Sequence, residues 1–336
     1  MDLKKILLKK DFEDILGQTE VKNQLKSALI MERHIILVGP PGCGKTTLVK
    51  NLAKLLPEIT VNDCPYHCNP DDPACPECRN NKNNKTKKIQ GEQRFIRIQG
   101  SPDLTSEDLL GDIDPIKAMK FGPMDPRSFT PGKIFKANNK ILFFDEINRC
   151  NEKLQNSLLQ ALEEKQTTIS SYDVYLKTNF IFIGTMNPDD VSTEPLSDVF
   201  IDRFDLIYMG YPEKLNLETK IVEQKGKKII DFPKDFLFLT IKFIHDLREN
   251  KDLEKLPSVR ASIGLYERAQ ANAFLDKRKN VKFEDIEKAI FSVLSHRIRL
   301  KPSVKYLQSP EDILQKELKR FKVENKIKKE KKSDVP

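Results

Sequence analysis

Residues 35–46 read IILVGPPGCGKT, and this stretch decides the fold of the 336-residue chain. The four apolar residues at its start are typical of a buried strand, and leucines at helical spacing follow it. The segment between them matches the pattern G-x-x-x-x-G-K-[ST], in which a strand, a glycine-rich loop and a helix follow one another. In that setting, backbone N–H groups and the helix N-terminus bind phosphate. The sequence therefore predicts a phosphate-binding loop.

This loop supplies the first group of candidate site residues. Lys45 is placed to reach the β- and γ-phosphates of a nucleotide, and the Thr46 hydroxyl is placed to ligate Mg²⁺. The remaining contacts to the nucleotide are expected from Gly39, Pro40, Pro41, Gly42, Cys43, Gly44 and Thr47. Cys43 is interpreted as a small residue at a variable position of the loop. ATP and Mg²⁺ are therefore the expected cofactors.

A pair of carboxylates follows a second apolar run. Residues 141–146 read ILFFDE, so Asp145 and Glu146 stand at the C-terminal end of a buried strand. Ligands bind at this edge of open α/β sheets. Asp145 suits the Mg²⁺ shell, and Glu146 suits the general base that polarises an attacking water. Together with the phosphate loop, the pair predicts hydrolysis of ATP.

Further apolar runs outline the rest of the fold. Strands are predicted from FIRI (95–98), FIFIG (180–184) and LIYMG (206–210), and runs that are apolar on both faces indicate a parallel sheet covered by helices. A helix is predicted over 151–165 and a short exposed hairpin over 167–179. After Tyr211-Pro212 the predicted elements are all helical, over 234–248, 260–275 and 284–299, with another helix beginning at Ser309-Pro310.

These patterns divide the chain into three expected parts. Residues 1–212 form an α/β core that contains a cysteine-rich insert over 61–90. Residues 213–310 form a helical domain, and residues 311–336 form a C-terminal helix with a basic tail.

The net charge of +8 is unevenly distributed. Segments 79–90 and 315–336 each carry +5, so the remainder is close to neutral. We expect 79–90 and the lysine-rich end from about 324 to be unpacked, because such runs are usually solvated. The charge is therefore a weak argument for a nucleic-acid partner. No apolar run reaches the length of a membrane span and no signal peptide is recognised, so a cytoplasmic protein is expected.

Four of the six cysteines lie close together, as Cys64, Cys68, Cys75 and Cys78. Thiolates at this spacing can close tetrahedrally on a structural Zn²⁺, which is the favoured interpretation. An iron–sulfur cluster, unmetallated thiols and two disulfides are the alternatives, the last disfavoured in a reducing compartment. His67 could replace one ligand, but with four cysteines available we interpret it as a bystander.

The order of these motifs resembles that of the AAA+ ATPases, from about residue 11 to residue 300 apart from the cysteine segment. The resemblance implies roles for three more residues. Asn187, in FIFIGTMNP, matches the sensor-1 polar residue, and Arg260, in LPSVRAS, matches the sensor-2 arginine of the lid domain. Arg203, in FIDRF, matches the arginine finger, which acts on ATP held by the neighbouring subunit. A homo-oligomeric ring, expected to be a hexamer, is therefore implied.

Two stretches, SPDLTSEDLLGDID (101–114) and FTPGKIFKANNKILFFDEINR (129–149), resemble the MoxR and magnesium-chelatase ATPase-subunit branch. The resemblance implies a P-loop core with a five-stranded parallel sheet, a helix-2 insert over 101–132, a pre-sensor-1 hairpin over 167–179 and a helical lid. It also implies a motor that drives a partner, often one with a von Willebrand A-type domain. In this branch the motor drives either metal insertion into a tetrapyrrole or maturation of a client complex. The residues of this chain do not indicate which of the two processes it drives.

A clamp-loader-like ATPase acting on nucleic acid is the alternative function. Clamp loaders also place a four-cysteine zinc module after the phosphate loop, and this chain is basic. The stretches quoted above belong to the first branch, however, and Arg203 stands in DRF where clamp loaders usually have SRC. A nucleic-acid partner is therefore not expected.

Overall fold

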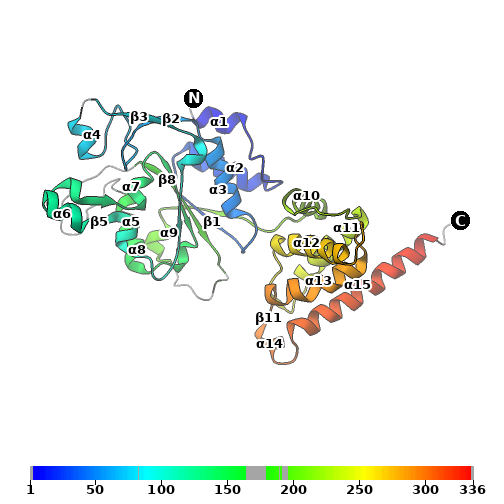
Figure 1. Cartoon of the computed structure of the whole chain (residues 1–336). Coiled ribbons are helices and arrows are strands. Elements are labelled where there is room, and N and C mark those ends of the chain that lie inside the picture. Colours follow the sequence, from blue (N-terminus) through cyan, green and yellow to red (C-terminus); the bar gives the residue numbers. More distant parts are fainter. Residues whose placement is uncertain (1–2, 82, 164–178, 189, 191–195, 334–336) are drawn as a thin grey trace. The chain divides into compact units, whose positions relative to one another are not determined.

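The computed structural model describes residues 3–81, 83–163, 179–188, 190 and 196–333. The chain forms two compact units: the first holds Met1–Pro40 and Gly44–Gly210, and the second holds Pro41–Cys43 and Tyr211–Pro336 (Figure 1). Each unit has its own hydrophobic core, and the two are described separately below.

A five-stranded parallel sheet forms the centre of the first unit. Its strands are ordered β4 (Phe95–Gln99), β7 (Lys140–Asp145), β8 (Phe180–Met186), β1 (Ile35–Val38) and β9 (Asp205–Tyr208). All five strands predicted from the apolar runs are therefore present, in one sheet. The middle strands are apolar on both faces because helices cover them, and Ile36, Leu142 and Phe182 are completely buried.

The helices of the first unit include α1 (Leu3–Lys9), α2 (Thr19–Ile30), α3 (Lys45–Leu55), α7 (Lys133–Lys136), α8 (Glu152–Glu163) and α9 (Asp198–Ile201). Helix α8 packs Leu154, Leu158 and Leu162 into a core that also contains Phe144 and Phe200. These leucines recur at helical spacing, which is why the helix predicted over 151–165 is found within one or two residues of its expected bounds.

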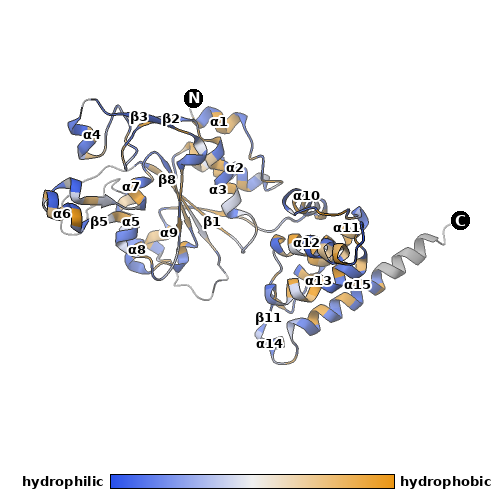
Figure 2. Cartoon of the chain, viewed as in Figure 1, coloured by the Kyte–Doolittle hydropathy of each residue, from blue (hydrophilic) through white to orange (hydrophobic). Residues whose placement is uncertain are grey.

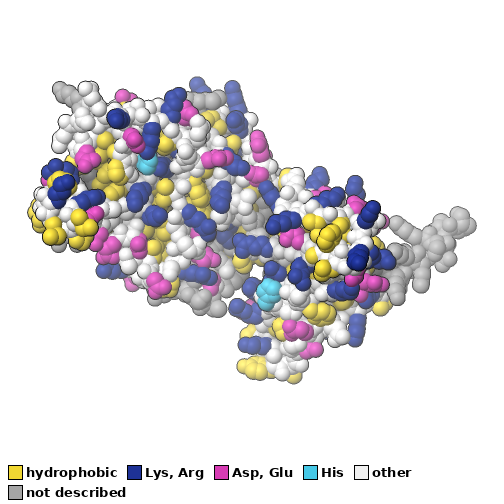
Figure 3. All heavy atoms as spheres, in the orientation of Figure 1, with side chains coloured by type: hydrophobic (Ala, Val, Ile, Leu, Met, Phe, Trp, Pro, Cys, Tyr) yellow, Lys and Arg dark blue, Asp and Glu magenta, His cyan; other side chains and the backbone are white. Residues whose placement is uncertain are grey.

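A small subdomain stands between β4 and β7, within the predicted helix-2 insert. It contains α5 (Ser106–Leu110), β5 (Gly111–Ile113), α6 (Pro115–Phe121), a 3-10 turn (Pro126–Ser128) and β6 (Phe129–Pro131), with β5 and β6 antiparallel. Helix α6 buries no residue, and apolar side chains gather on the surface where it lies (Figure 3). The hairpin predicted over 167–179 lies, except for Asn179, outside the described residues.

The cysteine-rich insert is more ordered than its sequence suggested. Strand β2 (Ile59–Asn62) and strand β3 (Thr86–Ile89) form an antiparallel pair, with helix α4 (Pro76–Asn80) between them. The expectation that 79–90 is unpacked is therefore wrong for 86–89. The side chains of Lys87 and Lys88 are exposed and form ion pairs with Asp63 and Glu58, whereas Ile89 is buried. The strand therefore keeps its charged residues in solvent and its apolar residue in the interior.

The second unit consists mainly of helices: α10 (Leu215–Lys225), α11 (Lys234–Arg248), α12 (Val259–Leu275), α13 (Phe283–Leu294), α14 (Pro302–Lys305) and α15 (Pro310–Ser333). Helices α12 and α13 alternate between apolar and polar segments (Figure 2). Their apolar faces meet in a core that includes Leu247, Leu265, Ile290 and Leu314. A short antiparallel pair, β10 (Leu253–Lys255) and β11 (Arg299–Leu300), completes the unit.

One expectation for this unit is corrected. The helix predicted over 284–299 ends at Leu294, because the chain passes through a 3-10 turn and then enters β11, where Leu300 is buried. The lysine-rich end is helical as far as Ser333, and the expectation that it is unpacked stays a prediction. The start of α15 was predicted correctly, since Ser309 and Asp312 exchange hydrogen bonds at its first turn.

Candidate functional site

The loop between β1 and α3 has the backbone conformation that its glycines allow. Gly42 and Gly44 have φ angles of 77° and 110°, a region that other residues adopt only with strain. Gly44 precedes the first residue of α3, so the helix N-terminus opens onto the loop. The Lys45 ammonium donates to the carbonyl oxygens of Gly39 at 2.6 Å and Pro40 at 3.0 Å. The lysine charge therefore lies against the loop itself.

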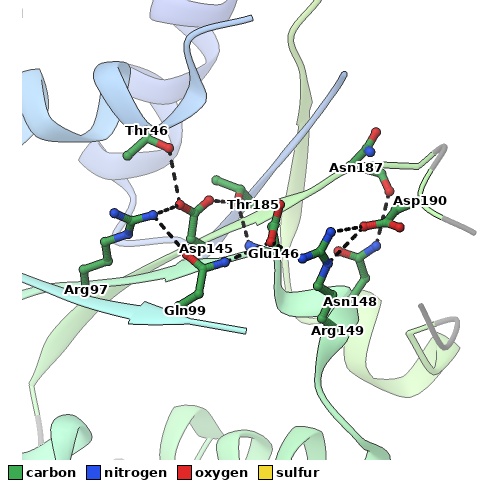
Figure 4. Close-up of polar contacts among 10 residues, drawn as sticks. All are labelled: Thr46, Arg97, Gln99, Asp145, Glu146, Asn148, Arg149, Thr185, Asn187 and Asp190. Carbon is green, nitrogen blue, oxygen red and sulfur yellow. Dashed lines mark hydrogen bonds and ion pairs between the residues drawn. The ribbon is translucent and has the colours of Figure 1, made fainter. Parts of the chain in front are cut away.

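Asp145 ends β7 beside this loop. Its carboxylate accepts hydrogen bonds from the hydroxyl of Thr46 at 3.5 Å and from the hydroxyl of Thr185, in β8, at 2.7 Å. Arg97, in β4, forms an ion pair with the same carboxylate at 2.6 Å (Figure 4). The structure thus brings together Thr46 and Asp145, the two residues that the sequence assigned to Mg²⁺.

Glu146 follows directly and turns away from the strand. Its φ of 57° is left-handed, and its N–H donates to the Thr185 hydroxyl at 2.9 Å. Its carboxylate accepts a hydrogen bond from Gln99 at 2.9 Å and pairs with Arg149 at 2.9 Å (Figure 4). Gly100 packs against this turn so closely that a Cβ there would overlap the Glu146 carbonyl oxygen.

Asn187 lies just beyond the end of β8, beside the same group of residues. Its carbonyl oxygen accepts a hydrogen bond from the buried side chain of Asn148 at 3.2 Å. Arg149 also pairs with Asp190 at 2.7 Å, and that hydrogen bond raises the pKa of Arg149. The sensor-1 candidate therefore stands in a polar network that continues from the two acids (Figure 4).

Of the two other arginines named from the sequence, Arg203 makes its contacts outside this network. Arg203 follows α9, pairs with Glu163 at the end of α8 and donates to the carbonyl oxygen of Val199. Arg260 lies in the first turn of α12, in the second unit, and is exposed.

Six residues of the network were not foreseen: Arg97, Gln99, Asn148, Arg149, Thr185 and Asp190. The sequence did indicate the first two, because Arg97 and Gln99 are polar residues two positions apart in the otherwise apolar strand FIRIQ. They therefore share a face of β4, and the register places Gln99 opposite Asp145. Thr185 gave no such signal, since a threonine in a buried strand is ordinary.

The four clustered cysteines form a second candidate site. Their Sγ atoms all lie within 4.8 Å of one another, and Cys68, Cys75 and Cys78 are buried. Backbone N–H groups point at the sulfurs: those of Cys68, Cys75 and Cys78 donate to the Sγ of Cys64, Cys68 and Cys75 at 3.3–3.4 Å. All six cysteines are free thiols, so the disulfide alternative is not what this structure contains.

The chemistry of this cluster fits a cation. Hydrogen bonds from the thiols of Cys68 and Cys75 lower the pKa of Cys64, while burial raises the pKa of Cys78 to about 11. Without a metal, ionisation of one thiol is thus favoured and ionisation of its neighbours is disfavoured. A bound cation would instead stabilise the thiolate form of all four cysteines. His67 is not a member of the cluster formed by the described residues.

The cysteine module is fixed to the rest of the first unit. The side chains of Asn138 and Asn139 donate to the carbonyl oxygens of Tyr66 and His67 at 3.2 and 3.1 Å. The Tyr66 ring meets Phe135, on α7, edge to face.

None of the helices among the described residues combines the length and apolar character needed to cross a membrane.

Comparison with known families matches three parts of the chain. Residues 80–206 match the ATPase family associated with various cellular activities (AAA), residues 255–317 match the AAA lid domain, and residues 11–67 match the magnesium chelatase subunit ChlI. All three matches follow the chain order that the motifs predict.

Curated relatives and a solved structure agree with these matches. The chloroplastic magnesium-chelatase subunit ChlI of Oryza sativa subsp. indica is 30% identical over 328 residues, covering 87% of this chain and 76% of that protein. The ChlI homolog of Methanocaldococcus jannaschii is 28% identical over 331 residues, covering 87% and 86%. NtrX from Brucella abortus in complex with ADP has the same fold, with a TM-score of 0.51 at 15% identity, covering 94% of this chain and 63% of that one. The chain belongs to the AAA+ ATPases, in the branch of MoxR and the magnesium-chelatase ATPase subunits.

Proposed function

We propose that this protein is a Mg²⁺-dependent ATPase motor that couples ATP hydrolysis to movement of a partner protein. The observation that carries the proposal is the meeting of Thr46, Asp145 and Glu146 at the carboxyl edge of the sheet, beside the glycine-rich loop. An oxygen donor pair next to a phosphate loop fits Mg²⁺, which prefers oxygen ligands and keeps several waters.

The proposed roles follow from position. Lys45 and the loop N–H groups hold the phosphates, Thr46 and Asp145 hold the cation, and Glu146 orients and deprotonates the attacking water. Bound Mg²⁺ would neutralise charge on the β- and γ-phosphates. Asn187 is the proposed sensor on the neighbouring strand. Gln99 and Arg149 both contact the Oε2 atom of Glu146, so the Oε1 atom is the proposed acceptor of the proton from the attacking water.

The proposal also covers the oligomeric state of the protein and the process that its ATP hydrolysis drives. Arg203 would act on ATP bound by an adjacent subunit of a hexameric ring, and Arg260 would act from the lid. A von Willebrand A-type domain is the proposed partner, with metal insertion into a tetrapyrrole or maturation of a client complex as the work performed. Metal insertion is supported by the relatives that are named as a magnesium-chelatase subunit ChlI or its homolog.

The cysteine module is proposed to hold a structural Zn²⁺ through Cys64, Cys68, Cys75 and Cys78. The proposed division of the chain is an ATPase core over 1–212, a lid over 213–310 and a C-terminal helix with a basic tail over 311–336. A cytoplasmic location is part of the same proposal.

Glu146→Gln tests the proposed ATPase. The amide keeps the shape of the side chain but cannot accept a proton, so ATP binding should persist while turnover is lost. Turnover is measured by phosphate release, and binding by titration with a fluorescent ATP analogue.

Glu152→Gln is the matched control, because it removes an exposed carboxylate from the start of α8. It should leave both binding and turnover unchanged. Full turnover by Glu146→Gln would disprove its role as the base.

A further inference from the structure

A cavity of about 250 Å³ lies in the first unit at the amino edge of the sheet. Its lining includes Lys4, Leu29, Arg94, Lys140, Leu162 and Phe180. Lys140 is the first residue of β7, the strand that ends at Asp145. With about 3.3 Å of rise per residue, the cavity lies about 16 Å from Asp145, at the opposite edge of the sheet. It is therefore separate from the candidate ATP site.

Lys140 is a buried cation without a counter-charge. Its residue is only 6% exposed, and within the described part of the chain its ammonium makes neither a hydrogen bond nor an ion pair. Burial, together with the nearby charges of Lys87 and Arg94, lowers the pKa of Lys140 to about 8. Most molecules therefore still carry the charge at neutral pH, and a buried charge left unpaired is costly.

Arg94 adds a second cation with only neutral partners. Its guanidinium donates to the carbonyl oxygens of Asn139 and Pro57, both at 2.9 Å. Burial lowers its pKa, and no carboxylate among the described residues pairs with it. These two bonds fix the guanidinium beside the cavity but leave its charge uncompensated.

The nearby acids do not pair with these two cations. Glu58 pairs with Lys88, and Asp63 pairs with Lys87. Glu32 also lines the cavity, but its residue is exposed and it pairs with neither cation. Lys140 and Arg94 therefore face a cavity in which the one carboxylate that lines it among the described residues, that of Glu32, pairs with neither of them.

We propose that this cavity binds a phosphate monoester, with the oxyanion held by Lys140 and Arg94. A phosphate dianion matches the two positive charges, and the guanidinium and ammonium are the groups that proteins use for phosphate. The apolar side of the cavity, formed by Leu29, Leu162 and Phe180, accommodates the organic part of the ligand. The proposal does not depend on ATP hydrolysis.

The test has to separate this site from the phosphate loop, which also binds phosphate. Lys45→Met removes the loop lysine, and the full-length chain with this substitution is the background. Its thermal unfolding is followed in phosphate and in NaCl of equal ionic strength. At about ten times its Kd, phosphate should raise Tm by about 2–4 °C, and phenyl phosphate should do so at lower concentration.

Lys140→Met in the same background should abolish both responses, while its Tm in phosphate-free buffer should be equal or higher because an unpaired buried charge is gone. Lys133→Met is the matched control, since it removes an exposed cation from the adjacent α7 and should leave the responses intact. If Lys140→Met does not fold, Lys140→Gln replaces it in the test. No phosphate response above that of NaCl, or an undiminished response after removal of the Lys140 charge, would overturn the site. Equal affinity for phosphate and phenyl phosphate would overturn the assignment of a monoester.

Discussion

Thr185 holds the two acids of the candidate ATP site in place. Its hydroxyl donates to Asp145 and accepts from the N–H of Glu146, so one buried side chain fixes both residues. Thr185→Val keeps the shape of the side chain but removes both bonds. Removing a residue that holds a metal ligand or a catalytic group typically lowers metal affinity or activity about 10–100-fold. ATP turnover should therefore fall by about that factor, and the Mg²⁺ concentration required for activity should rise. Steady-state ATPase assays over a Mg²⁺ titration measure both.

Thr185→Ser provides the control for this substitution. The serine hydroxyl can make the same two hydrogen bonds, so turnover should be largely restored. Wild-type turnover and Mg²⁺ dependence in Thr185→Val would mean that the hydroxyl positions nothing of consequence.

Glu218 is a fully buried acid in the second unit, with three polar partners. It pairs with Arg248 at 2.6 Å and His245 at 2.8 Å, and accepts a hydrogen bond from Ser262 at 2.5 Å. Burial opposes its ionisation, but the bonds from His245 and Arg248 prevail and lower its pKa from 4.5 to about 2. The pKa is lower in the folded state, so Glu218 stabilises the fold above about pH 4.5, and this contribution is lost as pH falls toward 2.

The stability at stake is about 3 kcal/mol, because one pKa unit corresponds to about 1.4 kcal/mol. Urea unfolding of the chain between pH 6 and pH 3 should show about 2 kcal/mol of this loss, because pH 3 is still above the pKa of the folded state. Glu218→Gln should destabilise the second unit at pH 7 by about 3–5 kcal/mol, since Arg248 remains buried without its partner. Glu223→Gln, an exposed position on the same helix, should change little. Equal stability of both variants would show that the buried pair contributes nothing net.

At the scale of elements, the regular parts of the fold could be predicted because their signals are local. The run IILV, the loop glycines and the leucines of α3 together specify a strand, turn and helix without reference to the rest of the chain. The five strands followed from apolar runs in the same way. The candidate site was predictable only as far as its motifs extend, and Thr185 had no motif.

The errors concern elements that depend on distant partners. Strand β3 is rich in lysine and carries a weak strand signal, and it forms because β2 pairs with it and supplies Asp63 nearby. The end of α13 was misplaced because β11 needs β10, about 45 residues earlier in the chain, to complete its ladder. Neither partner can be identified from the segment itself.

The cysteine module should lose its metal on a single substitution. Cys68 is completely buried among the other three sulfurs, so Cys68→Ser removes a central ligand. Elemental analysis of the purified chain should give one zinc for the native protein and less for the variant. Limited proteolysis should then cut within 64–80, because the metal, and not a large apolar core, holds this segment.

Cys150→Ala is the control, because Cys150 is buried elsewhere and burial raises its pKa to about 11. It should retain zinc and resist proteolysis. Iron with sulfide in place of zinc would establish the cluster alternative, and the absence of any metal from native protein would refute a metal site.

At the scale of the whole molecule, the excess of positive charge is concentrated in two segments of the sequence, 79–90 and 315–336. Within the basic segment 79–90, Lys87 and Lys88 are neutralised by acids of the same module. The other concentration of charge lies in the last part of α15 and in the residues beyond it.

Arg203 is the residue through which a requirement for the proposed ring can be tested. Its side chain pairs with Glu163 of its own chain and does not join the network around Asp145, so its proposed action depends on a neighbour. Arg203→Ala alone should lose most turnover, as should Glu146→Gln alone. If the finger acts in trans, mixing the two inactive variants should restore activity. A site is then complete where an Arg203→Ala subunit supplies Glu146 and its Glu146→Gln neighbour supplies Arg203.

Random mixing in equal amounts makes about one quarter of the sites complete, so turnover should recover to about that fraction of the wild-type value. The measurement is ATP turnover against the mixing ratio, with a maximum at equal amounts. Arg33→Ala mixed with Glu146→Gln is the control, since Arg33 makes only an exposed ion pair with Asp205 and its own turnover should be intact. That mixture should fall steadily toward zero as the inactive subunit increases. Failure of the Arg203→Ala mixture to recover, in rings shown by light scattering to contain both subunits, would mean that Arg203 acts only within its own chain.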